Sequence, residues 1–131
     1  MSKKEVRILL VEDNPILREL LKYNLKGTGF LVDTVENCKE VVSYLNGTIP
    51  DLIVCDIMMP IMDVFDLRSI IFQYPKLNSI PFIFLTAKDQ NEFKIRCKEL
   101  VVENYLTKPF LPKQLVEKIQ AVLHEHYSKK E

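Results

Sequence analysis

Four short apolar runs in this chain end on side chains that can do polar chemistry. These side chains are Glu12 and Asp13, Asp56, Thr86 and Lys108. The carboxyl ends of parallel strands lie along one edge of a sheet, where ligands bind, so we expect all five in one pocket. Three carboxylates there would repel one another, and a divalent cation with a preference for oxygen ligands, such as Mg²⁺, would relieve that repulsion. Lys108 could hold a phosphate oxygen, which makes Asp56 the expected nucleophile for formation of an aspartyl phosphate.

The elements that position these residues are predicted from apolar runs that alternate five times with amphipathic segments. This alternation is typical of a parallel α/β sheet. The predicted strands lie near 6–11, 30–35, 51–55, 81–86 and 103–107. The third strand shows no alternation of apolar and polar residues, so we expect it to be buried on both faces.

Five helices are expected between and after the strands. The first begins at Pro15 with Asn14 as its N-cap, and Asn37 could cap the second. The expected apolar face of the first helix consists of Ile16, Leu17, Leu20, Leu21 and Leu25. Leu67, Ile70, Ile71 and Tyr74 mark the third helix, and residues 89–100 form the fourth. The last begins at Pro112 with a core face of Leu115, Ile119, Val122 and Leu123, before a polar tail at 127–131.

Length and composition predict one globular domain over residues 1–131. Eighteen basic and 18 acidic residues give a net charge of zero, whereas a domain that binds DNA through its own surface carries a basic excess. We therefore expect no direct nucleic-acid partner. Cys38, Cys55 and Cys97 are far apart and lack CxxC spacing, which argues against a disulfide framework or zinc site and favours the cytoplasm. No apolar stretch approaches the ~20 residues that span a bilayer, so no membrane partner is expected.

Four motifs together resemble the receiver domain of two-component response regulators. They are Val11-Glu12-Asp13-Asn14, the stretch from Asp56 to Asp63, Leu85-Thr86-Ala87, and Tyr105-Leu106-Thr107-Lys108-Pro109-Phe110. The resemblance covers almost the whole chain, in order and with the spacing of the family. It implies a flavodoxin-like (CheY-like) doubly wound (βα)₅ fold with a parallel five-stranded sheet of order 2-1-3-4-5.

The resemblance also implies residue roles. Asp56 would accept a phosphoryl group from a histidine kinase or phosphotransfer protein. Asp13, Asp56 and the backbone carbonyl of Met58 would ligate Mg²⁺ (or Mn²⁺), with Glu12 acting through water. Lys108 would contact the phosphoryl oxygens. The peptide bond between Lys108 and Pro109 would be cis. Thr86 and Tyr105 would be the switch pair, and the surface of helix four, strand five and helix five would change for a partner, with homodimerisation through it as one outcome.

The chain departs from the family pattern at three positions. Val64 stands where the family usually has glycine, and Val101-Val102 replace a usual Gly-Ala pair. A β-branched residue disfavours the backbone geometry that glycine permits, so we expect a shifted loop or local strain there. Met58 and Lys88 occupy the positions that govern access of water to the acyl phosphate in this family. Because Met58 cannot orient a water, we expect slow self-dephosphorylation, which Met58→Asn should accelerate in a measured hydrolysis time course.

Two alternatives remain beside the phosphorylation switch. A lone Asp after a strand is usually a cap or turn residue, so a receiver-like interaction module that works without phosphorylation is one alternative. An aspartyl-nucleophile phosphatase of the haloacid-dehalogenase type is the other. Those enzymes need a second Asp two residues after the nucleophile, and Met58 stands there in this chain. The leading hypothesis is a regulatory domain that phosphorylates itself and hydrolyses slowly, and not a turnover enzyme.

Overall fold

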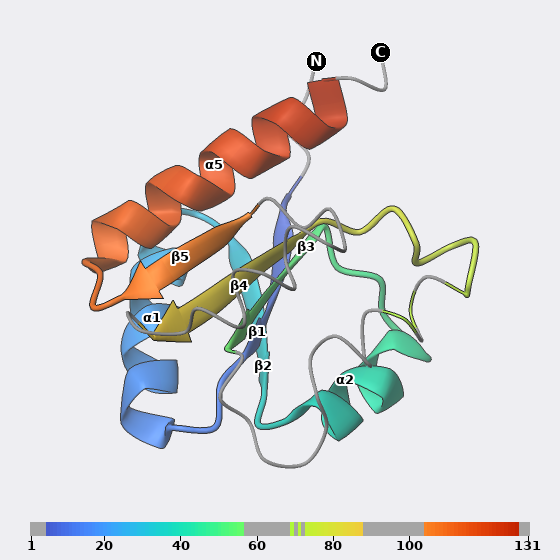
Figure 1. Ribbon diagram of the computed structural model, residues 1–131, viewed down its shortest axis with the longest axis horizontal. Helices are drawn as coiled ribbons and strands as arrows, with labels where there is room; N and C mark the ends of the chain where they lie inside the picture. Colours follow the sequence, from blue (N-terminus) through green and yellow to red (C-terminus); the bar gives the residue numbers. More distant parts are fainter. Residues whose placement is uncertain (1–4, 57–68, 70, 72, 88–103, 129–131) are drawn as a thin grey trace.

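A computed structural model describes residues 5–56, 69, 71, 73–87 and 104–128 of the chain. Its centre is a parallel five-stranded sheet of order β2-β1-β3-β4-β5, as predicted (Figure 1). The strands are β1 Arg7–Val11, β2 Leu31–Val35, β3 Leu52–Asp56, β4 Phe82–Ala87 and β5 Tyr105–Lys108. The helices with described bounds are α1 Pro15–Gly27, α2 Cys38–Leu45 and α5 Pro112–Ser128. The predicted flavodoxin-like α/β fold is therefore confirmed.

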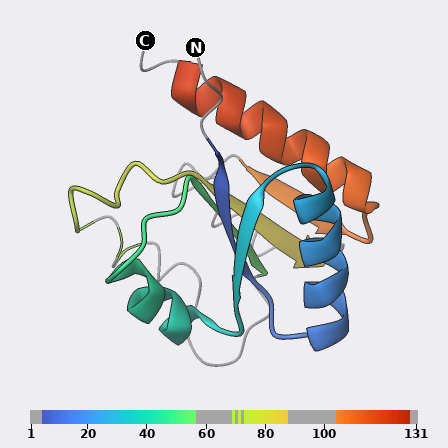
Figure 2. The same ribbon diagram turned by 180° about the vertical axis from the view of Figure 1, so that it is seen from behind.

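Two hydrophobic clusters cover the two faces of this sheet. Residues of α1 and α5 pack with alternate positions of the central strands, such as Ile8 and Leu10 of β1. The intervening positions, such as Leu9 and Val11, pack with α2 on the other face. The view from behind shows α1 and α5 together on one side of the sheet and α2 on the other (Figure 2). The alternation follows from the two-residue period of a strand, and it makes this a three-layer molecule.

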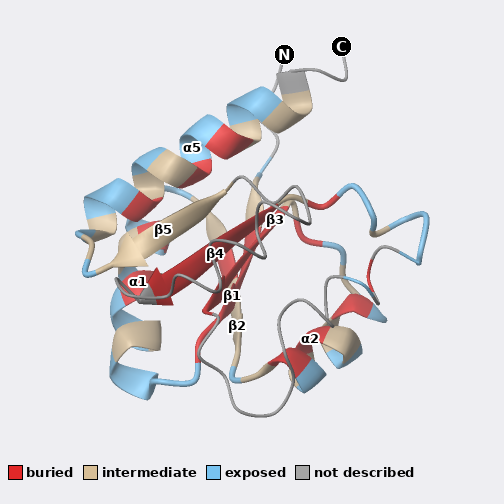
Figure 3. Cartoon of the chain, in the orientation of Figure 1, coloured by how far each residue is buried: buried red, intermediate tan, exposed pale blue. Residues whose placement is uncertain are grey.

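The central strands are the most buried part of the molecule (Figure 3). All five residues of β3 are buried, which confirms the prediction that this strand is buried on both faces. Cys55 is part of this core, as expected. The observed strands begin or end one or two residues from the predicted positions, and the shift matters only at the functional edge. Asp56 is the last residue of β3 and Lys108 the last of β5, so both are fixed by sheet hydrogen bonding.

Side-chain caps fix where α1 and α2 begin. The Asn14 Oδ1 atom accepts hydrogen bonds from the N–H groups of Ile16 and Leu17, and Pro15 occupies the first helical position. Asn37 caps α2 by accepting from the N–H of Glu40. Both caps were predicted from the sequence, because Asn satisfies N–H groups that the first helical turn leaves without intrahelical partners.

The predicted apolar face of α1 is partly wrong. Leu21 and Leu25 are buried and Leu17 packs against them, but Ile16 is 81% exposed and Leu20 is 50% exposed. Leu17, Leu21 and Leu25 are spaced by four residues and form a narrow stripe, which is all that the sheet and α5 cover.

Two other helix predictions have different outcomes. Tyr74 was assigned to the core face of a third helix, but it lies in a bend and is exposed, whereas Ile71 is buried as expected. The core face predicted for α5 is confirmed, with Leu123 only partly buried. Within the described residues, no helix has the length and apolar character needed to cross a membrane.

Candidate functional site

The carboxyl edge of the sheet brings the predicted residues together. Glu12 and Asp13 directly follow β1, and Val11 pairs with Cys55 in β3. Asp56 pairs with Leu85 in β4, so Thr86 lies one residue further along that strand. Lys108 pairs with Ala87. Parallel register thus delivers residues from four strands to one place, as the sequence predicts.

Three carboxylates form an acidic cluster at this edge. Glu12, Asp13 and Asp56 each offer a carboxylate oxygen within 4.8 Å of the others. Asp13 is exposed, whereas Glu12 and Asp56 are 1% and 2% exposed. Together with Thr86, these two are the buried polar residues of the described part of the chain. Such a concentration of buried acids lowers the free energy of unfolding, because burial penalises charge that is not compensated.

Lys108 supplies the positive charge at the centre of the cluster. Its Nζ atom donates a hydrogen bond to Asp56 Oδ2 and forms an ion pair with it. The same Nζ lies 3.7 Å from Glu12 Oε1. The Lys108–Pro109 peptide bond is cis, as the resemblance implied. One ammonium group therefore faces two buried carboxylates, and it cannot neutralise both of them when both are ionised.

The pKa of Glu12 reflects this imbalance. Burial of the carboxyl, followed by the charge of Asp56, raises the pKa of Glu12 to about 7. The N–H of Asn14, which donates to Glu12 Oε2 at 3.2 Å, and the charge of Lys108 lower it only in part. A carboxyl whose pKa is raised so far by burial together with a charged neighbour is typical of functional sites.

One oxygen of Glu12 has an ion-pair contact with Lys108 but no hydrogen-bond partner. Glu12 Oε1 is buried and makes no hydrogen bond within the described residues. Buried polar atoms are nearly always satisfied, so an exception needs a cause. The three carboxylates of the cluster, one of which carries this oxygen, include no imidazole or thiolate and form a donor set of the kind that Mg²⁺ prefers.

Thr86 and Tyr105 lie on one face of the sheet. Alternation along β4 places Thr86 on the face of Phe84, and Tyr105 pairs with Phe84 across the two strands. The Tyr105 ring packs against the cluster that contains Phe84 and α2. Thr86 is completely buried and Tyr105 partly so. The two predicted switch residues are thus neighbours on the sheet, and their roles stay predictions.

Several predicted features lie outside the described residues. They are Met58 with its carbonyl ligand, the Asp63-Val64 loop, most of helix three, Lys88, helix four, and Val101-Val102. Six of the predicted site residues are described. The structure brings Glu12, Asp13, Asp56, Thr86 and Lys108 to the carboxyl edge of the sheet, whereas Tyr105 is the first residue of β5 and pairs with Phe84.

Sequence reasoning missed Arg18 of α1. Its Nη1 atom donates to the backbone carbonyl of Glu12 at 3.0 Å, and its Nη2 atom lies 3.7 Å from Glu36 Oε1. A signal was present: Arg18 lies near the start of α1, where a cation opposes the helix dipole.

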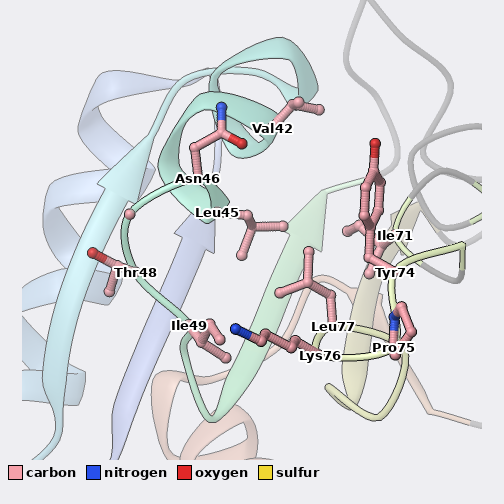
Figure 4. Close-up of a pocket in the computed structure, with 11 residues that line it drawn as sticks. Val42, Leu45, Asn46, Thr48, Ile49, Ile71, Tyr74, Pro75, Lys76 and Leu77 are labelled. Atoms are coloured by element: carbon pink, nitrogen blue, oxygen red, sulfur yellow. The ribbon is translucent and has the colours of Figure 1, made fainter.

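A separate hollow of about 580 Å³ lies near the amino ends of β3 and β4 (Figure 4). Leu45 and Val42 of α2 face Ile71 and Leu77 across it. None of the predicted site residues lines this hollow. The polar chemistry of the described residues is therefore gathered at the opposite edge of the sheet.

Comparison with known proteins gives one consistent result. The sequence profile of the response regulator receiver domain matches residues 8–120. The phosphate regulon transcriptional regulatory protein PhoB of Klebsiella pneumoniae is 36% identical over 117 residues, which are 89% of this chain and 51% of PhoB. The alkaline phosphatase synthesis transcriptional regulatory protein PhoP of Bacillus subtilis is 35% identical over 94% of this chain and 49% of its own. This chain thus spans about half the length of these two regulators.

A solved structure agrees with the sequence matches. The signal receiver domain of a signal transduction histidine kinase from Syntrophus aciditrophicus superposes with a TM-score of 0.83 at 35% identity, over 92% of this chain and 91% of that chain. The profile covers most of the sequence, and the fold and acidic edge agree with it. The chain belongs to the response regulator receiver domains, the signal receivers of two-component systems.

Proposed function

We propose that Asp56 is the phosphoacceptor and that its phosphoryl group comes from a phosphohistidine of a histidine kinase or phosphotransfer protein. The observation that carries this proposal is the buried Asp56 carboxylate, ion-paired with Lys108 and within 4.8 Å of two further carboxylates. A purely structural ion pair would match one acid with one base. The surplus negative charge and the unsatisfied Glu12 oxygen support a site that awaits a cation.

The proposed transfer needs little covalent work from the protein. A carboxylate oxygen of Asp56 forms a bond to phosphorus, the phosphorus–nitrogen bond of the phosphohistidine breaks, and its electron pair stays on the imidazole. Lys108, already at Asp56, would hold a phosphoryl oxygen as charge spreads over the group. Catalysis would then consist of positioning and neutralisation of charge, which fixed groups at strand ends do well.

Asp13 and Asp56, with the carbonyl of Met58, would hold Mg²⁺, and Glu12 would support it through water. The ion would supply positive charge to the phosphoryl oxygens and to the acids. Asp13 is exposed, so Mg²⁺ would enter the site from its side. Glu12 is buried, which suits a residue that supports the ion through water. Asp13 and Glu12 would also orient the waters that the ion keeps.

Phosphorylation is further proposed to act through Thr86 and Tyr105 on the surface of helix four, β5 and α5, with homodimerisation as one outcome. Analytical ultracentrifugation with and without acetyl phosphate tests this part, and identical sedimentation would contradict it. We propose that residues 1–131 form one such domain in the cytoplasm, without direct contact to nucleic acid. Slow hydrolysis, argued from Met58, belongs to the same proposal.

One experiment tests the central step. The protein is incubated with acetyl phosphate and Mg²⁺, and its intact mass is measured for wild type, Asp56→Asn and Asp33→Asn. We expect one phosphoryl adduct on wild type and on Asp33→Asn, and none on Asp56→Asn. The absence of an adduct on folded wild type would favour the interaction module, and rapid turnover without an adduct would favour a phosphatase.

A further inference from the structure

The side chain of Arg18 connects three segments around the acidic cluster. Arg18 belongs to α1, its Nη1 atom donates to the Glu12 carbonyl at 3.0 Å, and its Nη2 atom lies 3.7 Å from Glu36 between β2 and α2. Its side chain is only 15% exposed. A long charged side chain loses considerable rotamer freedom when held in this way, so the contacts must offset that cost.

We propose that Arg18 is a positioning residue that fixes the Glu12-Asp13 backbone so that both carboxylates face the cation. This inference rests on the proposed function, because it concerns the same acidic site. The Glu12 carbonyl precedes Asp13 directly, so the hydrogen bond from Arg18 fixes the peptide that joins the two acids. A rotation of that peptide would move both carboxylates relative to Asp56.

The hydrogen bonds on either side of this peptide do not involve the Glu12 carbonyl, to which Arg18 donates. The N–H of Glu12 donates to the Val35 carbonyl at 3.1 Å, which fixes the strand side of the turn. The N–H of Asn14 donates to Glu12 Oε2, and the Asn14 side chain caps α1. The Glu12 carbonyl lies between these two fixed points, and the guanidinium of Arg18 is its donor.

The contact with Glu36 is the weaker half of the arrangement. Glu36 is 65% exposed and 3.7 Å from Arg18, and ion pairs of this kind contribute little because water screens them. A charged donor to a backbone carbonyl in a partly buried place is stronger. Arg18 should therefore act through the Glu12 carbonyl and not through the ion pair.

The test measures Mg²⁺ affinity of the full 131-residue chain by isothermal titration calorimetry, without a phosphodonor. Arg18→Met keeps the apolar stem and removes the donors, and we expect its dissociation constant for Mg²⁺ to rise about tenfold, the range seen for residues that orient metal ligands. Arg18→Lys keeps one cationic donor and should restore most of the affinity. Glu36→Gln should change the constant by less than about twofold.

Arg7→Met is the matched control, since it also removes a guanidinium paired with a carboxylate, in this case Asp33, at the start of β1. It should leave Mg²⁺ affinity unchanged. Urea unfolding of each variant shows whether it is folded under the conditions in which Mg²⁺ affinity is measured. An unchanged constant in folded Arg18→Met, or an equal change in Arg7→Met, would overturn the inference alone. Absence of Mg²⁺ binding by wild type would overturn the proposed function and the inference with it.

Discussion

The surroundings of two carboxyl groups in this molecule, Asp33 and Glu12, shift their pKa values in opposite directions. Asp33 of β2 accepts hydrogen bonds from Arg7 Nη1 at 2.8 Å and from the Tyr44 hydroxyl at 2.5 Å. Burial would raise the pKa of Asp33, but the bonds from Tyr44 and Arg7 outweigh it and the pKa is lowered. Glu12 faces Asp56, and burial together with that charge raises the pKa of Glu12 to about 7.

The difference lies in the neighbours and not in the carboxyl groups. Asp33 meets two donors, so ionisation of Asp33 stabilises the fold. Glu12 meets another acid and keeps one unsatisfied oxygen, so its ionisation destabilises the fold unless a further cation arrives. The Asp33 arrangement is what a structural ion pair requires. The Glu12 arrangement lowers the stability of the fold, which is typical of a functional site.

The largest expected effect comes from removal of the cation at the acidic cluster, Lys108. Lys108→Met should slow phosphorylation by acetyl phosphate about 100-fold, the size of effect seen when one group that stabilises developing charge is deleted. Arg7→Met should leave this rate unchanged, because Arg7 serves only the Asp33 network. Intact-mass time courses at saturating Mg²⁺ measure both. A Lys108→Met rate within twofold of wild type would remove the functional distinction between the two regions.

The pH dependence of stability should have opposite signs in the two regions. The pKa of Glu12 is raised from 4.5 to about 7, so the metal-free protein loses stability as pH rises from 5 to 8. The shift corresponds to roughly 3 kcal/mol in the free energy of unfolding. The pKa of Asp33 is lowered, so the stability from its ionised form is present above the ordinary value of 3.8 and is lost as pH falls below it.

Urea unfolding in EDTA at pH 5.5 and pH 8 measures the Glu12 contribution. Glu12→Gln should abolish most of the difference, and millimolar Mg²⁺ should restore stability at pH 8 by binding the folded state. Equal loss of stability in wild type and Glu12→Gln would contradict the assignment of this effect to Glu12.

The sequence predicted the strands and the acidic site because both leave local signals. Short apolar runs mark the strands, and polar side chains at their ends converge through parallel topology. The burial of Glu12 and Asp56 follows from the same topology.

The parts that the sequence did not predict depend on tertiary contacts. Ile16 and Leu20 continue the apolar pattern of α1, yet the sheet and α5 cover only a narrower stripe. Arg18 contacts a backbone carbonyl, which any residue could supply, so no residue type marks its partner. The Asp33 network joins residues 7, 33 and 44, and only the folded register of β1 with β2 brings them together.

Tyr44→Phe should give the smallest effect and isolates the structural region. The phenol donates to Asp33 from a partly exposed position, so its loss should lower the free energy of unfolding by about 1 kcal/mol at pH 7. The Arg7 donor remains, so Asp33 keeps one partner and its carboxylate stays ionised. Urea unfolding measures the loss, and Tyr23→Phe, at an exposed position of α1, is the control. Because the Tyr44 hydroxyl donates to Asp33 and not to a carboxylate of the acidic cluster, phosphorylation by acetyl phosphate should proceed at the wild-type rate. A slower rate would show that the two carboxylate regions are coupled.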